Sequence, residues 1–320
     1  MDLLTGLILI GIVLIMLVVV LSVLLITKNI NSRKLNMHDA LLSGEKLEDH
    51  AIKTALEHSV SSPKKLSYWP IPRMNDNFAF ILSVYISLNE EIQKKHAIPE
   101  SAEWLLDNFY IIEEQVKNLR RDLTKKDMRS LPVLNSGALK GYSRIFAVAI
   151  ELVGHTNGQV DEKNLADYLK AYQSHHILQD KEIWALPGVI RLALIENVRH
   201  LCEDIKQTTQ QWHQADGVFN QWLDEEGEDR DRFMKSLREN LLKTEEVDSS
   251  FIEHLFYRLR RSTHSYVDVL KIMDEILIQL GTTTLSVTQK EHNAQSMNTV
   301  LMGNSFTSLR YFSSMDWTEL

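Results

Sequence analysis

Two short groups of residues have side chains that could perform chemistry. Asp229 and Asp231 stand one residue apart, and such a pair of carboxylates can hold the divalent metal of a nucleotide-sugar transferase. That motif normally ends an apolar strand, whereas this one lies in the charged run "DEEGEDRD". The adjacent His175 and His176 lie near Glu182, but neighbouring side chains point in different directions, which suits metal chelation poorly. We therefore expect no catalytic, cofactor-binding or metal-binding residue in this chain.

The run "EWLLDNFYIIEEQVKNLRRDL", residues 103–123, sets apolar side chains against many charges. It could be an active-site helix or a packing helix with one solvated face. Its apolar positions recur at spacings of 3 and 4 and form one stripe: Leu105, Phe109, Ile112, Val116, Leu119 and Leu123. The stripe favours packing. Glu113 and Arg120 lie at its margin, where a neighbouring helix could cover them, so both are candidates for structural ion pairs.

Arg191 lies among the apolar residues of "PGVIRLALIENVRHLCEDI". We expect it to be partly buried, and a buried guanidinium needs a carboxylate or several carbonyls as partners. A structural tie is favoured over a ligand site. Cys202 in the same run is most simply a small buried apolar residue.

Composition limits the classes of protein that this chain can be. A net charge of −8 argues against nucleic-acid binding, which needs a basic surface to meet phosphates. One cysteine cannot form an intramolecular disulfide, so a reducing compartment is the simpler expectation for the soluble part. The 12 glycines and 6 prolines leave few places for tight turns and therefore favour long helices over many strands.

The first residues predict a transmembrane helix. Residues 3–26 carry no charge, and at about 1.5 Å per residue they reach roughly 36 Å, enough to cross a bilayer core of about 30 Å. Asp2 before the run and Lys28 after it do not fit a cleaved signal peptide. Lys28, Arg33 and Lys34 place the rest of the chain in the cytoplasm by the positive-inside rule. The lipid bilayer is thus the first expected partner.

The fold class expected is all-α, with an N-terminal transmembrane helix followed by a helical cytoplasmic domain of long packed helices. Helical spacing of apolar residues predicts helices over 35–59, 77–97, 101–123, 141–154, 162–174, 187–225 and 250–280. Residues 282–320 also favour helix, although "TTTLSV" could be a strand. The last residues are apolar and carry no stop signal, so we expect a truncated chain.

Changes in composition along the chain predict its domains. We expect a transmembrane anchor over 1–27, a juxtamembrane segment and proline-containing linker over 28–76, and a helical domain over 77–226. A charged linker over 227–248 then precedes a helical C-terminal part over 249–320.

Five segments, in this order, resemble the N-terminal region of the cyclic β-1,2-glucan synthases. They are "AEWLLDNFYIIEEQVKNLRRDL", "LPVLNSGALKGYSRIFAVAIELVGHTNGQVD", "YLKAYQ", "EIWALPGVIRLALIENVRHL" and "GNSFTSLR". The resemblance runs from about Leu41 to the end. It departs from the family at Ser143, where a proline is common, and at Lys181-Glu182, where a Gly-Glu pair is common. These departures suggest a distant member.

The resemblance implies a large multi-pass enzyme of the bacterial inner (plasma) membrane that builds a cyclic glucan from UDP-glucose with a divalent metal. Its transferase signature, including Gln-x-x-Arg-Trp, is absent from this sequence. The chain would then be a non-catalytic portion that scaffolds or regulates a glucosyltransferase, in the same polypeptide or in a separate chain. A free-standing anchored interaction module and an enzyme with an unrecognised site remain the alternatives.

Overall fold

The structure is a computed structural model that describes residues 35, 40–61, 69–243, 248–262 and 267–314. The expected transmembrane segment lies outside these ranges. Within them, every helix is too short or too polar to span a bilayer.

Helices form most of the described chain. They are α2 (Glu45–Glu57), α3 (Pro70–Gln93), α4 (Glu100–Asp122), α5 (Lys125–Arg129), α6 (Arg144–His155), α7 (Glu162–Gln173), α8 (Asp180–Asp224), α9 (Gly227–Leu241), α10 (Ser249–Arg261), α11 (Val267–Gln279) and α12 (Thr284–Ser314). Two strands of two residues each, β1 (Val60–Ser61) and β2 (Val133–Leu134), pair antiparallel with Val60 opposite Leu134. The expected all-α architecture is confirmed for the described residues.

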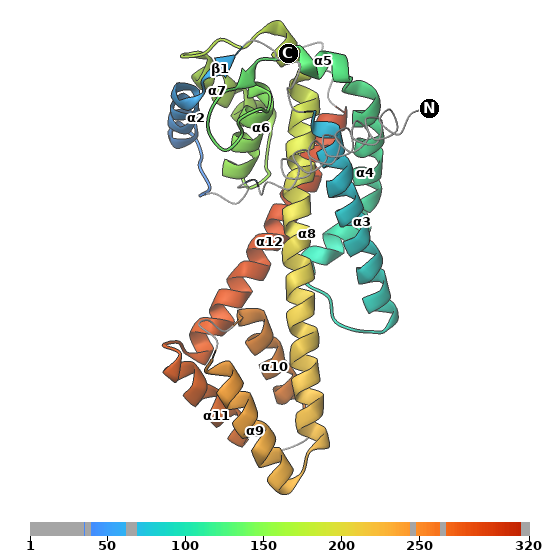
Figure 1. The fold of residues 1–320 in the computed structure, drawn as a ribbon, viewed down its shortest axis with the longest axis vertical. Helices are drawn as coiled ribbons and strands as arrows, with labels where there is room; N and C mark the ends of the chain where they lie inside the picture. The colour runs from blue at the N-terminus through green and yellow to red at the C-terminus, as the bar shows by residue number, and fades with distance from the viewer. Residues whose placement is uncertain (1–34, 36–39, 62–68, 244–247, 263–266, 315–320) are drawn as a thin grey trace, which may run out of the picture.

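Helix α8 is the axis of the molecule (Figure 1). Its 45 residues extend over about 68 Å at 1.5 Å per residue. Helix α8 contacts α3, α4, α6, α10 and α12. Its N-terminal half is buried on almost every side from Leu186 to Cys202, whereas only one face is buried in its C-terminal half. A helix that is apolar on most sides belongs in the centre of a fold.

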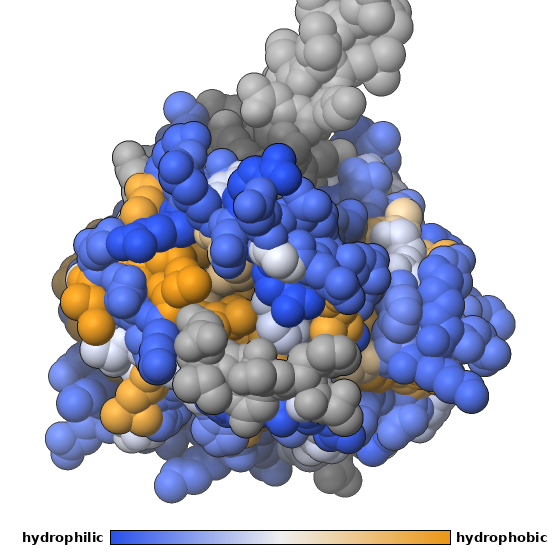
Figure 2. Space-filling model, turned by 90° about the horizontal axis from the view of Figure 1, so that it is seen from below, coloured by the Kyte–Doolittle hydropathy of each residue, from blue (hydrophilic) through white to orange (hydrophobic). Residues whose placement is uncertain are grey.

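The described residues form two hydrophobic cores that α8 and α12 share. The larger core contains residues of every helix from α2 through α7, together with the first half of α8 and the second half of α12. The smaller core joins Phe219 and Trp222 of α8 to α9, α10, α11 and Val287 of α12. Figure 2 shows the molecule from the end of the smaller core, where apolar residues gather in patches between hydrophilic side chains.

Several expected boundaries are corrected. Residues 227–241 of the expected charged linker are helix α9, because Phe233, Met234, Leu237 and Leu241 recur at helical spacing and Met234 is buried. The helix expected over 250–280 is two helices, α10 and α11, and Asp248 caps the first by accepting from the backbone N–H of Ser250 and Phe251. The wider division into domains stays a prediction.

Helix α8 also begins earlier than the sequence analysis expected. It starts at Asp180 and continues through Pro187, whereas the sequence pattern predicts a start at residue 187. Gln179 and Glu182 form a capping box at this N-terminus, and Gln179 N donates to Glu182 Oε2 at 2.9 Å. The cap and the buried face around Leu186 compensate for the backbone hydrogen bond that a proline cannot donate.

Candidate functional site

The motif considered for a transferase metal does not have the geometry of a metal site. Asp229 and Asp231 are exposed near the start of α9, and Asp229 pairs with Arg232. Arg230 lies between them in sequence and stacks over the Trp222 ring, 5.3 Å from its centroid. The two aspartates therefore do not fit the divalent metal of a nucleotide-sugar transferase.

The other sequence candidates occupy ordinary structural positions. Cys202 is fully buried, and burial raises the pKa of its thiol, as expected of a packing residue rather than a nucleophile. His175 and His176 lie in the turn after α7, outside the metal-like clusters found among the described residues.

Glu113 and Arg120 are both exposed, so no neighbouring helix covers them. Arg120 Nε donates to Asn75 Oδ1 at 3.0 Å, and its guanidinium lies 5.9 Å from the centre of the Phe78 ring. Glu113 forms no ion pair with any residue that the structure describes. The exposure of both side chains contradicts the expectation that a neighbouring helix covers them.

Arg191 lies between α8 and the C-terminal end of α4. Its side chain is 11% exposed, and its Nη2 atom is 3.6 Å from Asp122 Oδ2. It also donates to Gln115 Oε1 at 3.3 Å and to the Pro187 carbonyl at 3.1 Å. Burial lowers the pKa of Arg191, and the charge of Asp122 opposes that shift. The arrangement is a tie between two helices and offers no open ligand position.

We expect Arg191→Met to lower the free energy of unfolding by about 1–2 kcal/mol, because Asp122 is 37% exposed and can recover its hydration. Urea unfolding followed by circular dichroism measures this change. Arg121→Met, which removes an exposed pair with the same aspartate, is the control and should change stability by less than about 0.5 kcal/mol. Equal effects of the two variants would contradict the role given to Arg191.

Two buried ion pairs, which the sequence analysis did not identify, join α8 to its neighbours. Arg73 of α3 donates to both carboxylate oxygens of Glu196, including Nε to Oε2 at 2.8 Å, and Asn77 adds a hydrogen bond at 2.6 Å. Burial opposes the charged form of Glu196, but hydrogen bonds from His200 and Arg73 outweigh it and lower the pKa of Glu196 to about 2. Glu196 is therefore a carboxylate at neutral pH.

The second buried pair joins the start of α6 to the start of α8. Arg144 Nε donates to Glu182 Oε1 at 2.9 Å, a second nitrogen donates to Oε2, and the Ile177 carbonyl accepts at 3.1 Å. Glu182 is 0% exposed. Burial disfavours the charge of Arg144, yet the hydrogen bonds to Glu182 raise its pKa. Both pairs are bidentate and make structural ties rather than open sites.

The segments that carry the family resemblance meet at a polar seam between α8, α12 and the turn after α6. Asn197 Nδ2 donates to Ser305 Oγ at 2.9 Å, and Ser308 Oγ donates to the Gly158 carbonyl at 2.8 Å. The backbone N–H of Val160 donates to Ser308 Oγ at 2.9 Å. The seam fixes α12 against the centre of α8.

Gly158 has a left-handed backbone, with φ of 72°, and lies directly against the seam. A Cβ atom there would lie 2.6 Å from Ser305 Oγ and 3.0 Å from Asn197 Nδ2. We expect Gly158→Ala to cost about 2–4 kcal/mol, from strain and overpacking together. Gly137→Ala is a matched control, since Gly137 has φ of 78° with no atom within 4 Å of a Cβ, and it should cost only the strain. If urea unfolding shows equal losses of stability in the two variants, the close packing of Gly158 against the seam is contradicted.

A groove of about 900 Å³ lies between α7 and the start of α8. It is lined by Leu169 and Gln173 of α7 and by Ile183, Trp184 and Pro187 of α8. Trp184 is 77% exposed. An exposed apolar surface with a few polar groups is typical of a contact site for another molecule.

Two clusters of histidine and glutamate have side-chain nitrogen and oxygen atoms close enough to share a cation. One consists of His50, Glu151 and His155, and the other of Glu91, His96 and His213. Burial opposes the charged form of Glu151, but its hydrogen bond with His50 outweighs this and lowers the pKa of Glu151. Hydrogen bonds from His96 and His213 similarly outweigh burial and lower the pKa of Glu91. Sequence analysis missed both clusters because each joins residues more than 100 positions apart.

Comparison with known proteins shows that a region of this helical chain is related in sequence to the cyclic β-(1,2)-glucan synthases. The relative is the cyclic β-(1,2)-glucan synthase NdvB of Rhizobium meliloti (strain 1021), with which the chain is 31% identical over 251 residues, or 77% of its length. The match spans about 8% of NdvB, so the activity of that whole protein does not pass to this chain by similarity alone. No family model matches the chain. The relationship expected from the five segments is confirmed, and its N-terminal placement stays a prediction.

Proposed function

We propose that this chain is the membrane-anchored, non-catalytic N-terminal portion of a cyclic β-1,2-glucan synthase, where it scaffolds or regulates the UDP-glucose-dependent glucosyltransferase part. The observation that carries the proposal is the 31% identity to NdvB over 77% of the chain. The uncharged run over residues 3–26 supports a single-pass anchor in the bacterial inner membrane, with the helical part in the cytoplasm.

Scaffolding needs a rigid body and a surface for the partner. The two buried ion pairs and the polar seam supply the rigidity, because each holds α8 to another helix at short range. The groove at Trp184 supplies a surface, and it is lined by residues of the family-like segments "YLKAYQ" and "EIWALPG". We propose that the glucosyltransferase part, in the same polypeptide or as a separate chain, covers this groove.

A non-catalytic role is supported by the position of the only aspartate pair considered for transfer. Transfer from UDP-glucose needs fixed positive groups or a metal at the departing diphosphate and a base at the acceptor hydroxyl. Asp229 and Asp231 are exposed on α9, and Asp229 pairs with Arg232.

The purified, detergent-solubilised chain should release no UDP from UDP-glucose above background in the presence of a divalent metal. The measurement is a coupled assay for UDP, with Asp231→Asn as the matched variant. Release that Asp231→Asn abolishes would contradict the non-catalytic role and make residues 229–231 an active site.

Deletion of residues 1–34 tests the anchor separately. When cells are fractionated in the absence of detergent, the shortened chain should no longer be found with the membranes. If as much of the shortened chain as of the full chain stays with the membranes, the proposed insertion is contradicted.

A further inference from the structure

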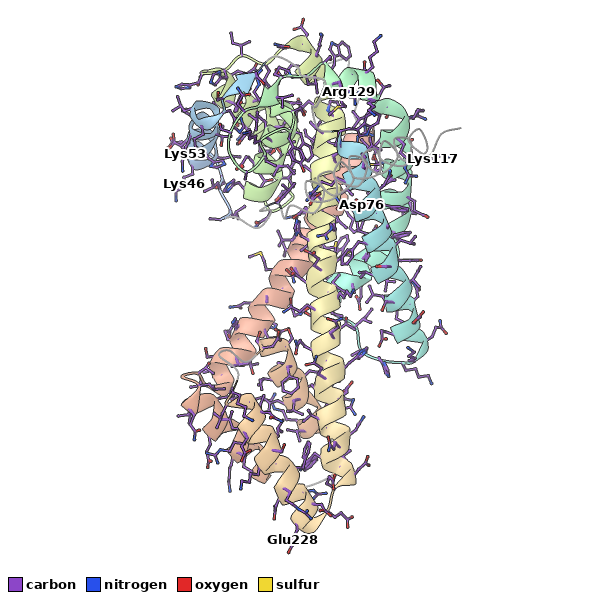
Figure 3. The ribbon with its side chains drawn as sticks, in the orientation of Figure 1. Lys46, Lys53, Asp76, Lys117, Arg129 and Glu228 are labelled. Carbon is purple, nitrogen blue, oxygen red and sulfur yellow. The ribbon has the colours of Figure 1, made fainter. Side chains whose placement is uncertain are left out.

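The first histidine–glutamate cluster joins α2 to α6. Glu151 and His155 stand four residues apart on α6 and therefore share one face of that helix. His50 comes from the inner face of α2, while Lys46 and Lys53 project from its outer face (Figure 3). His50 Nε2 is 3.1 Å from Glu151 Oε2, and His155 Nε2 is 3.7 Å from the same oxygen.

Hydrogen bonding determines which nitrogen of His155 faces the carboxylate. His155 Nδ1 lies 3.0 Å from the Ala40 carbonyl oxygen, which only accepts hydrogen bonds, so Nδ1 carries the proton. In the neutral ring, the lone pair of Nε2 then faces Glu151 Oε2, which also carries lone pairs. A cation between these two atoms, either a proton or a metal ion, would attract both lone pairs.

The distances also fit a metal ion. In a tetrahedral zinc site with ligand distances of about 2.0–2.1 Å, neighbouring ligand atoms are about 3.3–3.4 Å apart. The two separations in the cluster, 3.1 and 3.7 Å, lie on either side of that value. A backbone carbonyl that accepts from the distal nitrogen of a histidine ligand is also the usual outer-shell partner in zinc sites.

We propose that His50, Glu151 and His155 bind one Zn²⁺ ion, or a similar borderline transition metal, through two imidazole nitrogens and one carboxylate oxygen. Three protein ligands leave a fourth position for water. Thr54 Oγ1 lies beside the cluster, 3.3 Å from His50 Nε2. The ion ties α2, the first described helix, to the larger core, and it does not depend on the membrane anchoring proposed above.

The second cluster is a natural comparison, because it has the same residue types with a different geometry. His96 Nδ1 and His213 Nε2 lie 2.8 and 2.7 Å from Glu91 Oε2, which are hydrogen-bond distances too short for two ligands of one zinc ion. Lys94 Nζ is 3.9 Å from the other oxygen of Glu91 and adds a competing positive charge. We infer that hydrogen bonds, and not a metal ion, hold this second cluster together.

The test measures Zn²⁺ binding by the full detergent-solubilised chain after removal of metals with a chelator. We expect one equivalent of Zn²⁺ per chain by competition titration. Glu151→Gln should weaken binding by more than about 100-fold, beyond the 10–100-fold effect of losing an outer-shell partner. His96→Gln, the matched change in the second cluster, should leave binding unchanged. Absence of a tight equivalent, or loss of binding in His96→Gln alone, would overturn the proposal.

A second variant keeps the test decisive if Glu151→Gln fails to fold. His50→Cys exchanges one ligand for a thiolate, so loading with Co²⁺ should produce a sulfur-to-metal charge-transfer band in the near ultraviolet. The unchanged chain, whose single cysteine, Cys202, is fully buried and is not one of the cluster residues, should show no such band with Co²⁺. Folding of each variant is checked by circular dichroism. A folded His50→Cys chain that binds Co²⁺ without this band would place the metal elsewhere.

Discussion

Glu196→Ala should lower the free energy of unfolding by about 3–5 kcal/mol, because it leaves the guanidinium of Arg73 buried without its carboxylate. Arg73 and Glu196 are 5% and 1% exposed, so water cannot replace the lost partner. Urea unfolding followed by circular dichroism measures the change. This loss is among the largest that one substitution should cause in the chain, since the same carboxylate also accepts from Asn77.

The double variant Arg73→Met with Glu196→Met is the control for this pair. Removing both charges and keeping apolar volume should restore most of the loss, because a buried pair often contributes little compared with well-packed apolar residues. A Glu196→Ala chain within about 1 kcal/mol of the unchanged chain would contradict the burial of the pair.

The pH dependence of stability follows from the same carboxylate. The pKa of Glu196 is lowered to about 2 in the folded chain from an ordinary value of 4.5. Its contribution is therefore complete above about pH 4.5 and is lost as the pH falls toward 2. Stability measured across this window should fall less steeply in the double variant than in the unchanged chain.

Arg144→Met should have an effect of similar size, about 3–5 kcal/mol, because Glu182 would remain fully buried as an unpaired charge. Among the described residues, the Glu182 carboxylate would keep only the hydrogen bond that it accepts from the Gln179 backbone N–H at the start of α8. We expect early loss of the contact between α6 and α8, seen as faster amide exchange in both helices.

Arg129→Met is the matched control for Arg144→Met. Arg129 is an exposed arginine of the short helix α5 (Figure 3), and its removal should change stability by less than about 0.5 kcal/mol. Similar losses in the two variants would show that Arg144 is not the buried tie that its geometry indicates.

Local pattern predicted the helices well where their caps and apolar stripes are strong. Helix α4 was expected over 101–123 and spans Glu100–Asp122, and α7 was expected over 162–174 and spans Glu162–Gln173. Helix α9 was missed because charged residues hide a four-member apolar stripe. Proline as a start signal places the beginning of α8 at residue 187, although its capping box, Gln179 and Glu182, lies eight and five residues earlier.

The candidate site could be predicted only in part, because its partners are distant in sequence. Arg191 was recognisable as a charge among apolar residues, and the same signal marks Glu196 in "LALIENV". Its partner Arg73 lies 123 positions away, and no local rule connects them. Glu151 and His155 share a helix face at a spacing visible in the sequence, but His50 joins them only through the packing of α2.

The central claim is that this chain supplies the supporting portion of a cyclic β-1,2-glucan synthase, and a chimera tests it most directly. The region of NdvB that matches this chain is deleted and then replaced by the corresponding residues of this chain, and cyclic glucan is measured in cells that lack their own synthase. The account predicts that deletion abolishes the product and that the chimera restores it. Trp184→Ser in the chimera should reduce the amount of cyclic glucan. The amount and stability of the chimeric protein should stay unchanged, since Trp184 is exposed at the groove. A chimera that is present in the membrane at normal levels but makes no more glucan than the deletion would contradict the account.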